Sequence, residues 1–142
     1  MIGATGSLIS KNLILTAGKN IYNKKLSQFA QDIWFIPSLL GDIGKAYHVS
    51  KTYYIPKKYI SEQHEEVDLF NFAILEIEEE LIGLTYGYFG IDVDYKPSMG
   101  TFVAGYSSEK SEDLKCFLRT TPLEQLVCQN EFFSYKETMY NT

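Results

Sequence analysis

Short apolar runs alternate with turn-forming residues along the whole chain, and most of the runs favour strands. In the first half they lie at residues 7–10, 13–17, 33–36 and 72–77. In the second half they lie at residues 100–106, 116–120, 126–129 and 132–135. Ser10-Lys11-Asn12 separates the first two runs, which predicts a tight hairpin. The pair at 116–120 and 126–129 is expected to form a second pair of strands around Pro122.

The longest alternating segment is YHVSKTYYI at residues 47–55. A period of two sets Tyr47, Val49, Lys51, Tyr53 and Ile55 on one face of a strand and the intervening residues on a wetter face. Pro56 then ends the strand.

No segment sustains a helical period for three turns. Residues 21–31 come nearest to such a period, and one short helical turn is expected there. Aromatic residues make up 15% of the chain, which suits half-buried strands. Many short strands with turns every 8–12 residues predict an all-β sandwich or barrel.

Composition narrows the function classes further. The net charge of −5 argues against nucleic-acid binding. No apolar run approaches the roughly 18 residues that a membrane-spanning helix needs. Cys116 and Cys128 are compatible with a disulfide or with two free thiols, and without clustered His they predict no zinc site. The sequence predicts no cofactor and no metal.

Five short motifs occur in a fixed order: GSLISKNLILTAG (6–18), YIPKKY (54–59), NFAIL (71–75), GYFGI (87–91) and VAGY (103–106). Together they resemble the trypsin/chymotrypsin-like serine protease family, in particular its glutamyl-endopeptidase branch. The resemblance implies an all-β, chymotrypsin-like double β-barrel. Residues 1–83 are expected to form a nearly complete N-terminal barrel, and residues 84–142 an incomplete C-terminal one.

The resemblance also places the catalytic positions, and there the chain departs from the family. Lys19 stands where the family has the catalytic His, and Asn71 stands where it has the catalytic Asp. No Gly-x-Ser-Gly-like turn matches the nucleophile, which is expected beyond residue 142. The cysteines that flank the His in animal trypsins are absent, since Ala4 and Asn20 take those places.

These substitutions change what the site can do. A general base works best with a pKa near the operating pH, whereas a lysine in water has a pKa of about 10.4. Burial can lower that pKa, and Ser–Lys enzymes exist. An active hydrolase with Lys19 as base is therefore the alternative hypothesis. Loss of both the imidazole and the carboxylate favours a homologue without peptidase activity, a pseudoprotease.

Other polar residues offer weaker substitutes. His48 and His64 lie outside the motifs and are interpreted as structural or exposed. Asp68 would need a different loop path to replace the missing carboxylate. The cluster of His64, Glu65, Glu66 and Asp68 lacks metal-ligand spacing and is interpreted as a solvated loop.

The leading hypothesis is thus a non-catalytic binding or structural module within a larger protein or assembly, with protein partners. Tyr54, Tyr86 and Tyr88 are candidate anchors for a partner, although packing within a barrel is the simpler explanation for each. The sequence leaves the compartment open. The family is usually secreted or periplasmic, yet no signal peptide is visible, and a cytoplasmic assembly fits as well.

Overall fold

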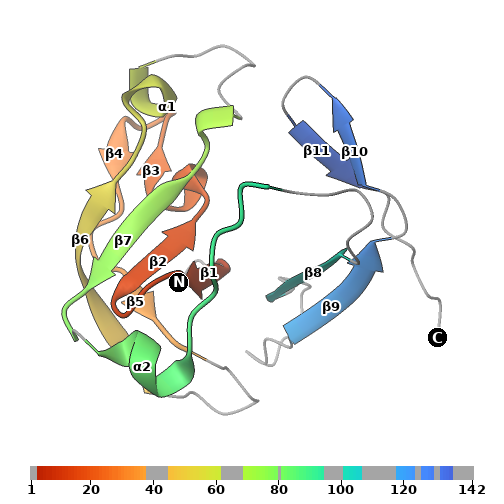
Figure 1. Ribbon diagram of the computed structural model, residues 1–142. Coiled ribbons are helices and arrows are strands. Elements are labelled where there is room, and N and C mark those ends of the chain that lie inside the picture. The colour runs from red at the N-terminus through yellow and green to blue at the C-terminus, as the bar shows by residue number, and fades with distance from the viewer. Residues whose placement is uncertain are drawn as a thin grey trace, which may run out of the picture.

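The computed structural model describes residues 3–37, 45–61, 69–79, 81–94, 101–106, 118–123, 126–129 and 132–135. Strands dominate them (Figure 1). The strands are β1 (Gly6–Leu8), β2 (Leu13–Thr16), β3 (Tyr22–Asn23), β4 (Gln28–Phe29), β5 (Trp34–Phe35), β6 (Tyr47–Tyr54), β7 (Ala73–Ile77), β8 (Thr101–Tyr106), β9 (Leu118–Leu123), β10 (Leu126–Gln129) and β11 (Phe132–Tyr135). The helical elements are the 3-10 turn η1 (Gly18–Asn20) and the short helices α1 (Lys57–Ser61) and α2 (Ile82–Tyr86). Within the described ranges, no helix has the length and apolar character to cross a membrane.

The largest unit is a five-stranded antiparallel sheet with the strand order β1-β2-β7-β6-β5. β1 and β2 form the hairpin predicted from the turn residues 10–12, with Ser7 opposite Leu15. β2 then pairs with β7, where Ile14 lies opposite Leu75. Figure 1 shows that this sheet curls into half of a barrel.

The core lies on one side of this sheet, and β7 crosses its centre. Ala73, Leu75 and Ile77 alternate along β7 and are at most 3% exposed, as the period of a strand requires. The full cluster consists of Leu8, Ile14, Ile21, Tyr47, Val49, Ala73, Leu75, Ile77 and Ile82. Full burial of each large aliphatic side chain contributes about 1.5–3 kcal/mol, so this cluster is the main source of stability in the sheet.

Helix α2 is joined to the β1–β2 turn through a glycine. The Gly83 N–H donates to the Lys11 carbonyl at 2.6 Å. A Cβ on Gly83 would collide with the backbone of Ser10 and Lys11. The close approach of these two backbones therefore requires glycine at this position.

The expected alternation of residues 47–55 fails at Lys51 and Tyr53. Tyr47 and Val49 are buried and Ile55 packs against the core, but Lys51 and Tyr53, expected on the same face, are exposed. The register between β6 and β7 shifts between Val49 and Lys51 and again between Thr52 and Tyr54. Each irregularity inserts a residue that lacks an opposite partner, and this re-aims the side chains that follow.

Residues 21–31 form a small hairpin rather than the expected helical turn. β3 pairs with β4, with Tyr22 opposite Phe29. The Tyr22 and Phe29 rings lie 4.8 Å apart between centroids. Cross-strand aromatic contact of this kind stabilises a hairpin, and it outweighs the weak helical pattern of the segment.

The strands of the second half pair differently from the prediction. β9 pairs with β8, with Ala104 opposite Thr120. β10 pairs with β11, with Cys128 opposite Phe133. The expected pairing of the two segments around Pro122 is therefore wrong, because each of them has a partner of its own. Cys116 lies outside the described residues. A disulfide between Cys116 and Cys128 therefore stays untested.

Candidate functional site

The position expected for the catalytic base lies in a tight turn directly after β2. In η1, the Asn20 N–H donates to the Ala17 carbonyl and the Ile21 N–H donates to the Gly18 carbonyl, each at 3.0 Å. Gly18 is buried, and a Cβ there would lie 3.1 Å from the Tyr59 ring and 3.3 Å from the Phe72 nitrogen. The packing of Gly18 against Tyr59 thus fixes the position of the next residue, Lys19.

Lys19 and Asn71, the positions expected for the base and the acid, meet at this turn. Oδ1 of Asn71 accepts a hydrogen bond from the backbone N–H of Lys19 at 2.9 Å. The two residues are separated by 52 positions in the chain. Asn71 precedes β7, which pairs with β2, so the sheet itself brings the two segments together.

The contact uses the backbone of Lys19 and not its side chain. The Lys19 side chain is exposed, whereas a Ser–Lys mechanism requires a desolvated lysine. Asn71 offers an acceptor oxygen and two N–H donors but carries no negative charge. The pair can hold the loop in place, but it contains neither an imidazole nor a carboxylate to orient one.

A second set of hydrogen bonds ties the same turn to the N-terminal segment. Asn20 Nδ2 donates to Thr16 Oγ1 at 3.0 Å, and Thr16 Oγ1 donates to the Thr5 carbonyl at 2.9 Å. This relay connects the neighbourhoods of Ala4 and Asn20, the two places where the sequence analysis noted missing cysteines. Side-chain hydrogen bonds therefore link these segments without a covalent bridge.

His48 is remote from this turn. The Glu78 N–H donates to the His48 carbonyl at 3.4 Å, at the far end of β7 from Asn71. From position 71 to position 78, at about 3.3 Å per residue, the separation along the strand is roughly 20 Å. The His48 ring instead packs edge-on against Trp34, with centroids 5.1 Å apart. His48 is therefore not placed to replace the missing imidazole.

The remaining candidates are only partly described. His64, Glu65, Glu66 and Asp68 lie outside the described residues. In the part of the chain that the structure does describe, no group of three or more His, Cys, Asp or Glu side chains is arranged to hold a metal ion.

The three tyrosines considered as anchors are all exposed rather than buried in a barrel. Tyr54 is 50% exposed, Tyr86 is 44% exposed and Tyr88 is 54% exposed. Tyr86 is also held by Tyr47, because their hydroxyl oxygens lie 3.2 Å apart. Each of the three side chains therefore has about half of its surface open to solvent.

Comparison with solved structures identifies the fold. The chain superposes on the structure of a Glu endopeptidase in complex with MPD, with a TM-score of 0.68 and 24% sequence identity. The match covers 84% of this chain and 56% of that chain, so this chain spans little more than half the length of the matched protein. No protein-family model matches the sequence, and no curated protein matches it. The chain therefore has the chymotrypsin-like β-barrel fold that its motifs predicted.

Proposed function

We propose that this chain is a serine-protease-like domain without peptidase activity, which acts through its surface as a binding or structural module. The proposal keeps the division expected from the motifs, with an N-terminal barrel in residues 1–83 and a partial second barrel in residues 84–142. It treats Lys19 and Asn71 as the degenerate base and acid positions.

The contact between Asn71 and the Lys19 backbone is the main support. It shows that position 71 serves the loop through an acceptor oxygen, a role that needs no charge. The exposed Lys19 side chain likewise contributes nothing to that contact. Neither side chain supplies the imidazole or the carboxylate that a Ser-His-Asp triad needs.

The two substitutions add a second line of support. Lys19 and Asn71 stand at the positions that the motifs assign to the base and the acid. Because triad members act as a unit, the loss of one already lowers the rate by several powers of ten. Selection for peptidase activity in this domain is therefore not needed to explain its sequence.

Labelling with a fluorophosphonate probe tests the proposal, with an active Glu endopeptidase as the positive control. We expect no labelling of the chain, and no hydrolysis of a fluorogenic peptide that contains Glu. The double variant Lys19→His with Asn71→Asp restores the base and the acid, and labelling that appears only in this variant would attribute the loss of activity to these two positions.

Two further variants identify the residue responsible if labelling occurs. Labelling of the unmodified chain that disappears in Lys19→Ala but persists in Lys11→Ala would establish Lys19 as the base and overturn the proposal. Lys11 is a suitable control because it is an exposed lysine in the β1–β2 turn.

A further inference from the structure

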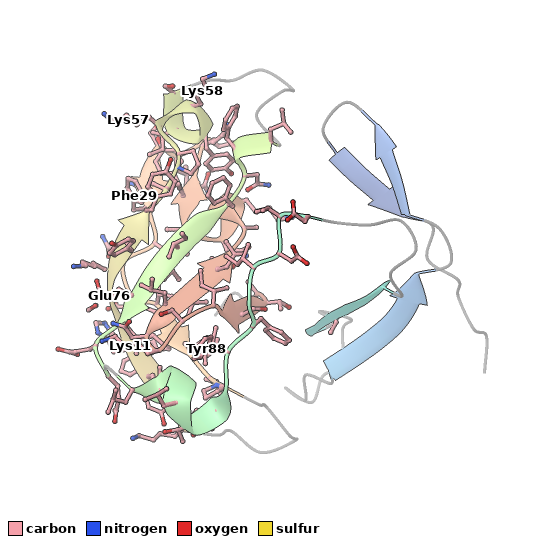
Figure 2. The ribbon with its side chains drawn as sticks, viewed as in Figure 1. Lys11, Phe29, Lys57, Lys58, Glu76 and Tyr88 are labelled. Carbon is pink, nitrogen blue, oxygen red and sulfur yellow. The ribbon has the colours of Figure 1, made fainter. Side chains whose placement is uncertain are left out.

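A groove on the outer surface of the sheet combines aromatic rings with lysines. It lies where β4, the end of β6, α1 and residues 69–72 meet, and its volume is about 780 Å³. Its lining includes Phe29, Tyr54, Lys57, Lys58, Phe70 and Phe72. Figure 2 shows Lys57 and Lys58 on α1 and Phe29 below them, at one end of the sheet. We call this surface the aromatic–lysine groove.

The rings of the groove are held in place although they remain open to solvent. Phe29 is 48% exposed, yet its ring packs on Tyr22. Tyr54 is 50% exposed, and its ring centroid lies 6.0 Å from that of Phe72, with an angle of 33° between the planes. Rings that are already ordered lose little conformational entropy when a ligand covers them.

The charges of the groove have one sign. Lys58 Nζ lies 5.0 Å from the centroid of the Phe70 ring, and Lys57 lines the same groove. Lys24, on the neighbouring β3–β4 turn, places its Nζ 4.3 Å from the centroid of the Tyr59 ring of α1. None of the described residues that line the groove is acidic. The described lining is thus cationic and aromatic, in a protein with a net charge of −5.

Ion pairs occur elsewhere in the described sheet. Glu76 approaches Lys51, and Glu79 approaches Lys45. These pairs lie along β6 and β7 or just beyond their ends. Neither pair involves Lys57 or Lys58, and the positive charges of these two lysines would attract the anionic groups of a ligand.

We propose that the aromatic–lysine groove binds an acidic peptide segment that carries aromatic side chains, supplied by a protein partner. The rings of the groove would cover the aromatic side chains of the peptide, and Lys57 and Lys58 would face its carboxylates. This inference rests on the proposed binding role and names the chemistry of the partner. Single-stranded nucleic acid also favours rings beside lysines, but the net charge of the whole chain opposes it.

Fluorescence polarisation with the full 142-residue chain tests the proposal. The probe is a fluorescein-labelled octapeptide in which Glu and Phe alternate, and its matched control has Lys in place of each Glu. We expect the Glu peptide to bind at least about tenfold more tightly, and its affinity to fall as salt screens the charges. Equal binding of the two peptides would overturn the proposal, as would tighter binding of a labelled oligothymidine.

Paired variants locate the binding site. Lys57→Gln with Lys58→Gln should weaken binding by roughly tenfold, since each exposed ion pair contributes up to about fivefold. Lys11→Gln with Lys45→Gln changes the net charge by the same amount and should leave the affinity unchanged. Tyr54→Ala removes an exposed ring and should weaken binding by about tenfold or more. The same loss in the control pair, or no loss in Tyr54→Ala, would contradict the assignment.

The two proposals fail in different ways. A chain that neither binds the Glu peptide nor reacts with the fluorophosphonate probe overturns the groove assignment and leaves the non-catalytic role standing. A chain that reacts with the probe overturns the non-catalytic role, whether or not the peptide binds.

Discussion

The inner face of the five-stranded sheet and the turn that follows β2 place different demands on their residues. On the inner face, Ile14 and Ile77 are each 1% exposed, and their entire side chains are in contact with other residues. At the turn, the contact between Lys19 and Asn71 uses the backbone N–H of Lys19 and one oxygen of Asn71. The inner face is therefore specified by side-chain shape, whereas the turn is specified by backbone geometry. The side chains at positions 19 and 71 can therefore be replaced without loss of the fold.

The largest effect should come from the inner face. Ile77→Ala removes most of a side chain that is 1% exposed and should destabilise the chain by about 2–5 kcal/mol. Leu84→Ala removes a side chain that is 66% exposed and should change the stability by less than about 0.5 kcal/mol. Urea unfolding of both variants measures the contrast, and similar losses would contradict the burial pattern.

Gly18 tests whether the turn after β2 also depends on packing. In Gly18→Ala, the new Cβ would lie 3.1 Å from the Tyr59 ring and 3.3 Å from the Phe72 nitrogen. One of these neighbours has to move, and we expect a loss of about 1–3 kcal/mol. Gly90→Ala meets no atom within 4 Å and is the matched control. Equal unfolding midpoints in urea would show that the contact with Tyr59 does not position the turn.

The same contrast explains how much of the fold could be predicted. The β1–β2 hairpin was predictable because turn residues separate two apolar runs, and β7 because its apolar run crosses the core. The pairing of β9 with β8 was not predictable from local signals, since pairing depends on contacts between distant segments. The exposure of Lys51 was missed because a register shift leaves no mark in an alternating sequence.

The turn with Lys19 and Asn71 and the aromatic–lysine groove also differ in how well the sequence predicts them. Lys19 and Asn71 could be located because each interrupts a recognisable motif. The aromatic–lysine groove could not be located in the sequence. Phe29, Tyr54 and Phe70 come from separate segments, and none of them interrupts a motif within its own segment. Such a surface forms only when the hairpin, the strand end and the helix meet in space.

A smaller effect should separate the acceptor role of Asn71 from charge. Asn71→Ala leaves the Lys19 N–H without its partner and should cost about 1 kcal/mol. Asn71→Asp keeps an oxygen in the same place and should retain most of the stability. Hydrogen exchange measures this directly, as the Lys19 amide should lose protection in Asn71→Ala but keep it in Asn71→Asp. Loss of protection in both variants would mean that the amide group itself is required.

The smallest effect should appear at alkaline pH. Hydrogen bonding to Glu76, whose Oε2 lies 2.9 Å from Nζ, raises the pKa of Lys51 above its ordinary value of 10.5. A hydrogen bond to Tyr47 raises the pKa of Tyr86 above its ordinary value of 10.0. Folding thus favours the protonated form of both groups. Their contributions are fully present below the pKa values of the unfolded chain.

These contributions are lost as the pH rises through the folded pKa values, so the melting temperature should fall slightly above about pH 10. In the double variant Lys51→Met with Tyr86→Phe, the decline should become shallower, because neither titrating group remains. Melting curves between pH 8 and 11 measure the slope. An unchanged slope would mean that these exposed contacts add nothing to the stability supplied by the inner face.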